Sequence, residues 1–164
     1  MKSSSLDRVR QALLNHKHDD TIIEFPEGTR SAEDAAKAVG CDVAQIVKSM
    51  IFRASGSGSD GTDDRPVLVL TSGSNRVDEA KVSALLNTPI KPADGRWVRA
   101  ITGFAIGGVA PIGHLAPPVI LIDEDLLAAP QIWAAAGSPM KVFSTSPSRL
   151  VEMTGGLTAN IRKD

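Results

Sequence analysis

The sequence predicts an α/β fold in which a mixed β-sheet packs with helices in a single compact domain spanning residues 1–164. The first observation is the length of 164 residues, which suits one domain because domains commonly run ~100–200 residues. The second is that short apolar segments with period-2 alternation lie between segments whose apolar residues recur at helical spacing. The third is the absence of an internal repeat or of a linker long enough to divide the chain. Together these features favour a layered fold with one core.

The composition is that of an ordinary globular protein. Hydrophobic residues make up 42% of the chain and charged residues 23%, which excludes wholesale disorder and a coiled coil. The chain has four Phe, two Trp and no Tyr. The core must therefore be built from Val, Ile, Leu and Ala.

In the first half, periodicity and end signals predict the elements in order. Leu6, Val9 and Leu13 recur at helical spacing and predict a helix near residues 4–16. Ser31 caps a second helix that ends at Gly40. A strand at residues 46–53 places Lys48 on the same side as Ile46, Met50 and Phe52. The other predictions are a short strand at 21–25 that ends at residues 26–28, a Gly/Ser/Asp-rich connection at 54–65 and a buried strand at 66–71.

In the second half, proline and glycine set most of the boundaries. Residues 103–118 form a Gly/Pro-rich loop that leads into a strand at 119–122, which is apolar on both faces as a central strand should be. Pro130 limits any helix within residues 126–136 to a short or kinked one. The remaining predictions are helices at 78–86, 93–101 and 147–153, the last with Ser146 as cap and Pro147 at its first position, and a strand at 141–144.

Three features predict a cytoplasmic protein. The single Cys41 cannot form an internal disulfide, which fits a reducing compartment. The N-terminal segment has no apolar run, so it is not a secretory signal. Residues 103–122 hold no charged side chain, but their prolines and glycines argue against a bilayer helix. We expect no membrane partner.

The net charge of −1 argues against a general nucleic-acid binder held by counterion release, and we expect no DNA partner. It leaves room for a local basic face. Five basic residues lie in one part of the chain and are either a solvated mixed-charge surface or a local basic face that contacts a nucleic acid: Arg76, Lys81, Lys91, Arg96 and Arg99.

Lys48 lies among apolar neighbours in the segment IVKSMIF. One interpretation is a strand lysine that extends its ammonium to the rim of the sheet. The other is a cation held for a substrate. Ser49 points to the opposite side of the strand and is not the predicted nucleophile.

The segment GGVAPIGH, residues 107–114, is the second chemical feature. Its glycines can expose main-chain amides, and its proline stiffens the loop. The result is either a cradle of N–H donors for a carbonyl oxygen or phosphate, or a tight turn between strands.

Together, IVKSM, the Thr102-Gly103 pair, GGVAPIGH and the strand ending at Ile122-Asp123 resemble the YbaK/ProX family of aminoacyl-tRNA deacylases. These proteins are relatives of the editing domain of bacterial prolyl-tRNA synthetases. The resemblance covers roughly residues 8–151, and SAEDAAKAVGCDVAQIVKSMIF is similar to the family's helix-then-lysine-strand segment. It implies a compact α/β fold and hydrolysis of a misplaced aminoacyl ester without metal or cofactor. It also implies a tRNA partner, which the five basic residues named above would contact, and possible association with an aminoacyl-tRNA synthetase.

The same resemblance implies roles for individual residues. Lys48 would orient the acyl or phosphate end of the substrate, and Gly108, Pro111 and Gly113 would form the loop that polarises the ester carbonyl and positions water. One preorganised donor of this kind is worth ~10²–10³ in rate. Small acyl groups such as alanine, serine or cysteine are the expected substrates, and shape alone separates them poorly.

Other residues near these motifs have two interpretations each. His114 is either a packing histidine or a substrate contact, and Asp123 is either a strand-end cap or a residue that orients a loop donor. Thr102, Gly103 and Gly107 are predicted to shape the mouth of the pocket. His16 and His18 do not share a helical face, and no metal site is predicted.

Three functions remain open from the sequence. The first is an editing hydrolase that acts in trans on mischarged tRNA, for example tRNA for proline. The second is a noncatalytic module of the same fold that binds tRNA or a synthetase. The third is hydrolysis of a small free ester or an aminoacyl adenylate.

Overall fold

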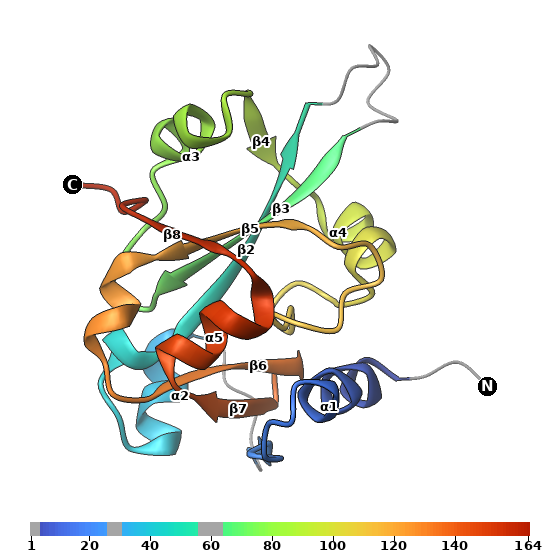
Figure 1. Cartoon of the computed structure of the whole chain (residues 1–164), viewed down its shortest axis with the longest axis vertical. Coiled ribbons are helices and arrows are strands. Elements are labelled where there is room, and N and C mark those ends of the chain that lie inside the picture. Colours follow the sequence, from blue (N-terminus) through green and yellow to red (C-terminus); the bar gives the residue numbers. More distant parts are fainter. Residues whose placement is uncertain (1–3, 26–30, 56–63) are drawn as a thin grey trace.

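Two β-sheets and five α-helices make up the described part of the chain, which comprises residues 4–25, 31–55 and 64–164 of a computed structural model (Figure 1). The larger sheet is mixed, and helices pack around it. The predicted α/β class with a mixed sheet is confirmed. The separate smaller sheet is a feature that the sequence analysis did not predict.

The larger sheet has the strand order β4-β2-β3-β5-β8. β2 (Val47–Ala54) pairs antiparallel with β3 (Arg65–Ser72) and with β4 (Ile90–Pro92). β5 (Val119–Asp123) lies parallel to β3, and β8 (Leu157–Ala159) lies parallel to β5. The carboxyl ends of β3 and β5 therefore meet the start of β2 at one edge of the sheet, where Lys48 pairs with Thr71.

The smaller sheet has the order β1-β7-β6 and lies beside the start of β2. Its strands are β1 (Ile23–Glu24), β6 (Ile132–Ser138) and β7 (Lys141–Thr145). A parallel bridge between Ile46 and Trp133 joins the two sheets. This junction places β6 next to the residues that precede and follow Lys48.

The helices begin at side-chain caps and several end at left-handed residues. Ser4 forms a capping box with Asp7, and Ser31 accepts a hydrogen bond from the Asp34 amide. Gly40 ends its helix with φ 76°, a conformation that favours glycine. The helices are α1 (Ser5–Asn15), α2 (Ala32–Val39), α3 (Glu79–Leu86), α4 (Gly95–Thr102) and α5 (Pro147–Thr154), with 3-10 turns η1 (Val43–Gln45) and η2 (Glu124–Ala128).

β3 forms the centre of the core because both of its faces are covered. Leu68 and Leu70 pack into the cluster that also contains Phe143 and α1 residues. Val67 and Val69 face the opposite cluster, against α3. Burying one large apolar side chain stabilises the folded state by roughly 1.5–3 kcal/mol. This strand is therefore a major stabilising element.

The strand β6 was not predicted from the sequence. Only a 3-10 turn precedes Pro130, in agreement with the expected limit on any helix there, and Ile132–Ser138 is the strand β6. Ile132, Ala134 and Ala136 are buried in alternation, which is the strand period. Burial of one face against the core overrides the weak helix propensity of this segment.

The other predicted elements match to within a few residues, except that the sequence analysis missed η1, β4 and β8. The predicted strand end at residues 26–28 and residues 56–63 of the predicted connection lie outside the described residues. None of the described helices has the length and apolar character needed to cross a bilayer.

Candidate functional site

Lys48 lies on β2 with its ammonium at the carboxyl ends of β3 and β5. Its Nζ donates a hydrogen bond to the main-chain carbonyl of Asn75, at 2.5 Å. Burial lowers the pKa of Lys48. The carboxylates of Glu33 and Asp123 oppose that shift, and the positive charge of Arg76 adds to it. A lysine ammonium has three N–H donors, so two remain for other acceptors.

A buried carboxylate organises the loop that holds Lys48. Asp123 Oδ2 accepts hydrogen bonds from Thr71 Oγ1 at 3.1 Å, from the Ser72 amide at 3.0 Å and from Asn75 Nδ2 at 2.8 Å. Burial alone would raise the pKa of Asp123, but the bonds from Asn75, Ser72, Asp125 and Thr71 lower it. Because Asn75 is held by this carboxylate, its carbonyl is fixed in front of Lys48.

A cavity of about 350 Å³ lies between the start of β2 and β6. Lys48 is the one charged side chain among its described lining residues. Its apolar lining includes Val47, Met50, Ile106, Val109, Trp133 and Val142. A largely apolar cavity with a few convergent polar groups is the usual form of a small-molecule site.

One end of the glycine loop, residues 107–114, lines this cavity. Gly107 and Val109 line it together with Lys48. The Gly108 amide instead donates to the Ala105 carbonyl at 2.9 Å, so this amide is already used within a turn. Gly108 has a packing role as well, since a Cβ there would lie 2.8 Å from Ser138 Cα.

Gly108→Ala is expected to lower stability by about 1–3 kcal/mol, because the added methyl would force the loop away from the turn between β6 and β7. Urea unfolding measures this effect. Gly95→Ala is the control, because its φ is outside the left-handed region and a Cβ there would meet Ile106 Cδ1 at an ordinary 3.5 Å. Equal losses in the two variants would contradict close packing at Gly108.

The rest of the loop lies elsewhere, and the structure does not bring Gly108, Pro111 and Gly113 together on the lining of this cavity. Neither Pro111 nor Gly113 is among the residues that line the cavity, and Pro111 is buried. Gly113 lies against α1, where its carbonyl accepts a hydrogen bond from Arg8 Nε at 3.1 Å. The sequence did not indicate this because the partner is 105 residues away in the chain.

Three more predicted residues belong to this second region. Thr102 is buried and its hydroxyl donates to the Val98 carbonyl at 2.7 Å, so it does not shape a pocket mouth. The Gly103 carbonyl accepts from Arg8 Nη2 at 2.6 Å. His114 packs edge-on against Phe104 and its Nε2 contacts the Ala110 carbonyl at 2.6 Å. Burial lowers the pKa of His114, and the nearby Arg8 adds to that shift.

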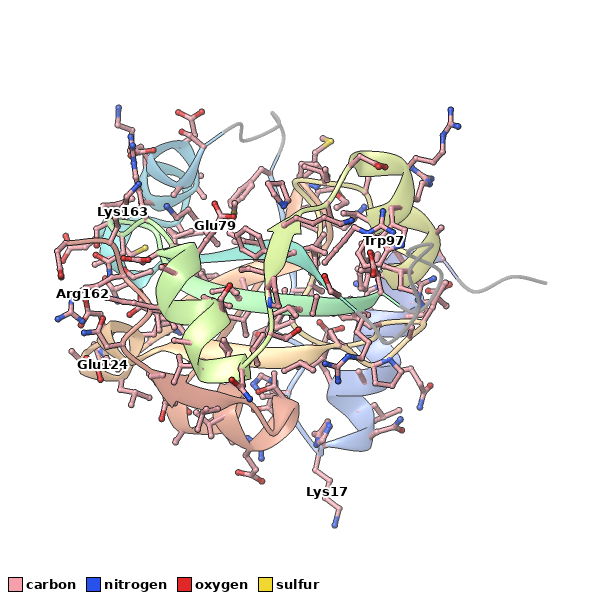
Figure 2. The ribbon with its side chains drawn as sticks, turned by 90° about the horizontal axis from the view of Figure 1, so that it is seen from above. Lys17, Glu79, Trp97, Glu124, Arg162 and Lys163 are labelled. Atoms are coloured by element: carbon pink, nitrogen blue, oxygen red, sulfur yellow. The ribbon has the colours of Figure 1, made fainter. Side chains whose placement is uncertain are left out.

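The five predicted tRNA contacts do not form one surface. Arg76 follows the carboxyl end of β3, whereas Lys91 pairs with Arg53 at the opposite end of β2. Lys81 donates to the Arg162 carbonyl at 2.7 Å. In Figure 2, Arg162 and Glu124 lie at one edge of the molecule and Trp97, on α4, lies toward the other.

Arg96 and Arg99 are the exposed pair on α4. They are three residues apart and so share a helical face. The first residue of α4, Gly95, lies next to Ile106, since a Cβ at Gly95 would be 3.5 Å from Ile106 Cδ1. Ile106 also lines the cavity. This pair is therefore the exposed basic feature on a helix that adjoins the cavity.

No group of three or more His, Cys, Asp or Glu side chains that could hold a metal ion occurs in the described parts of the chain.

A family model described as an aminoacyl-tRNA editing domain matches residues 26–153. The chain belongs to this family. The match includes Lys48, Asn75, the glycine loop and Asp123. The predicted family resemblance is therefore confirmed, and these residues of the site lie within the matched range.

Two solved structures are similar over nearly the whole chain. One, described as a proposed trans-editing enzyme for prolyl tRNA synthetase, is 41% identical with a TM-score of 0.87 and covers 100% of both chains. The other comes from epitope backbone grafting by computational design and is 39% identical, with a TM-score of 0.89, covering 99% of this chain and 100% of that one.

Sequence relatives include an uncharacterized protein and parts of synthetases. YwhH of Bacillus subtilis (strain 168) is 26% identical over 150 residues, which is 92% of this chain and 91% of YwhH. The proline–tRNA ligase of Lactobacillus helveticus (strain DPC 4571) is 30% identical over 136 residues, 82% of this chain but 22% of the ligase. The chain therefore corresponds to about a fifth of that ligase.

Two residues of the site were missed from sequence. Asn75 lies in the polar segment SGSN after a buried strand, and Ser49 was set aside because it points away from Lys48. The signal for Asn75 was available, since polar residues that follow parallel strands gather at the carboxyl edge of a sheet. Ser49 gave no such signal, because the strand β6 on the other side of the cavity was not predicted.

Proposed function

We propose that this chain is an aminoacyl-tRNA deacylase that hydrolyses mischarged tRNA in trans, with the cavity beside Lys48 as its active site. The observation that supports this most is that Lys48 and the main chain of Gly107 line one cavity in a member of the editing-domain family. The 41% identical structure described as a proposed trans-editing enzyme supports action in trans. An aminoacyl-tRNA synthetase for proline is the proposed protein partner.

The proposed reaction is hydrolysis of the ester between the amino acid and the terminal ribose. Water adds to the ester carbonyl, the bond to the ribose oxygen breaks, and the products are a free amino acid and a tRNA with a free hydroxyl. Lys48 donates N–H groups to the oxygen that gains negative charge, and the loop at Gly107 borders the same space. The Asp123–Asn75 network keeps the ammonium in place.

The experiment is a deacylation screen with alanine, serine, cysteine and threonine each esterified to tRNA for proline and to unrelated tRNAs. We expect release of at least one small amino acid, with uncharged tRNA acting as a competitive inhibitor. Tight tRNA binding without release of any amino acid would instead favour the noncatalytic module. Release that uncharged tRNA does not inhibit would favour a small free ester as substrate.

Reversing the charge of Arg96 and Arg99 together is expected to raise KM for charged tRNA by tenfold or more at low salt, because both are exposed on α4, whose first residue lies next to the cavity-lining Ile106. Each lost phosphate contact should reduce the slope of log affinity against log salt by about 0.7–0.9. The control is the double change Lys17→Glu and Lys163→Glu, which alters net charge equally; both lysines are exposed and are labelled in Figure 2 away from Trp97 of α4. Equal effects of the two pairs would remove α4 from the tRNA contact.

A further inference from the structure

Ser49 carries a buried hydroxyl that has no hydrogen-bond partner within the described structure. It lines the same cavity as Lys48. Buried polar atoms in native proteins nearly always have a partner, and leaving one without costs about 1–3 kcal/mol. Such an atom in a substrate cavity is explained if a ligand supplies the missing bond.

The strand geometry also leaves the main chain at Ser49 without a neighbouring strand on one side. The Gly73 amide donates to the Ile46 carbonyl at 2.7 Å, so the main-chain groups of Ile46 face β3. By alternation, those of Ser49 face the other edge of β2. β4 covers that edge only from Phe52 to Ala54, which leaves the edge at Ser49 open toward the cavity.

Two other serine hydroxyls line the cavity, and both are engaged. Ser31 Oγ accepts the Asp34 amide at 3.1 Å, and Ser138 Oγ accepts the Met140 amide at 3.0 Å. Of the three, Ser49 alone has its hydroxyl without a partner. It is therefore the lining hydroxyl to which the described residues supply neither a donor nor an acceptor.

The charges around the cavity indicate which part of an aminoacyl group Ser49 would contact. No carboxylate is among the described lining residues, and the one cation is Lys48. An α-ammonium group that contacted Ser49 would find no carboxylate among these lining residues to pair with. A neutral hydroxyl or thiol suits Ser49, because a serine hydroxyl both donates and accepts.

We propose that Ser49 is a specificity-determining residue whose hydroxyl binds the side-chain hydroxyl or thiol of a small aminoacyl group, so that the site prefers seryl or cysteinyl over alanyl esters. This inference rests on the proposed function and names the substrate class within it. One such hydrogen bond gives a preference of up to about tenfold.

The test uses stable amides of serine and alanine on 3′-amino-3′-deoxyadenosine, which mimic the charged tRNA end and can bind whether or not esters are hydrolysed. We expect the unaltered protein to bind the seryl amide about tenfold more tightly than the alanyl amide. Ser49→Ala should abolish this preference by weakening seryl binding alone. Ser49→Thr, which keeps the hydroxyl, should retain it.

Thermal unfolding separates this role from a structural one. Ser49→Ala removes an unpartnered hydroxyl, so Tm should stay unchanged or rise, whereas Ser138→Ala removes a partnered one and should lower Tm. A lower Tm in Ser49→Ala would show that the hydroxyl has a structural partner and would overturn the inference.

Equal binding of the two amides to the unaltered protein, equal weakening of both by Ser49→Ala, or no binding of either would also overturn it. The deacylation screen decides the proposed function separately. Turnover of esters without a Ser49-dependent preference would leave the deacylase proposal intact and remove only the role of Ser49.

Discussion

Replacing Lys48 by methionine is expected to lower kcat/KM for deacylation by about 10²–10³-fold, the usual effect of removing one preorganised donor to a developing oxyanion. Methionine keeps most of the length of the side chain and its packing on β2. The loss should appear mainly in kcat, because the proposed interaction is strongest in the transition state. Steady-state kinetics with the preferred charged tRNA measures it.

The control for this change is Lys37→Met, which removes an exposed lysine from α2 and should leave kcat/KM unchanged. Urea unfolding of both variants verifies that the fold persists. Activity of Lys48→Met within twofold of the unaltered protein, across the panel of esters, would show that the lysine has no catalytic part.

The pH profile gives a second readout of the same residue. Burial lowers the pKa of Lys48 below its ordinary value of 10.5, so its charge is lost at a lower pH than that of an exposed lysine. If the charged form is required, kcat/KM should fall as pH rises through this lowered pKa. The residual activity of Lys48→Met should lack that alkaline decline.

Local sequence signals were sufficient for most elements because their causes are local. The cap residues Ser4 and Ser31 and the left-handed Gly40 act within one or two turns, and they set the helix ends where the sequence predicted them. The alternation along β2 also held, with Val47 and Phe52 buried on opposite faces. Lys48 was found from this alternation and from its apolar neighbours.

The rest of the site depends on contacts between distant segments. Gly113 was predicted beside Lys48 because both belong to family-like motifs, but Arg8 on α1 holds it in another region. A pattern of glycines shows that a chain bends or packs closely without showing against what. The cavity itself forms between β2 and β6, and β6 is a strand that the sequence analysis did not predict.

Asp123→Ala is expected to lower the free energy of unfolding by about 3–5 kcal/mol. It removes an acceptor that is fully buried and leaves the Thr71 hydroxyl and the Ser72 amide without their partner. Hydrogen bonds to a charged group contribute about 1.5–3 kcal/mol each, and unpartnered buried donors add their own cost. Urea unfolding at neutral pH measures the loss.

Asp125→Ala is the matched control two residues away. Asp125 also accepts from Asn75, at 2.8 Å, and pairs with Arg162 at 3.2 Å, but it is exposed. Exposed pairs contribute about 0–1 kcal/mol, so this variant should lose no more than that. If the two variants lost equal stability, the buried network would not be what holds this edge of the sheet together.

The pH dependence of the same difference follows from the sign of the shift. The pKa of Asp123 is lower in the folded protein than its ordinary value of 3.8, because the hydrogen bonds outweigh burial. Its stabilising contribution is therefore fully present above about 3.8 and is lost as pH falls through the folded pKa. The gap in stability between the unaltered protein and Asp123→Ala should narrow only in that acid range.

Asp123→Asn separates the effect on stability from the effect on Lys48. The amide keeps the shape of the carboxylate and one acceptor, so the variant should remain folded at neutral pH even if Asp123→Ala does not. The change also puts an amide NH₂ group where the oxygen that accepts from Asn75 Nδ2 stood, and one N–H donor cannot bond to another. Asn75 then loses an anchor for the carbonyl that holds Lys48, and kcat should fall while KM changes little. A folded Asp123→Asn with unchanged kcat would mean that Lys48 keeps its position without this network.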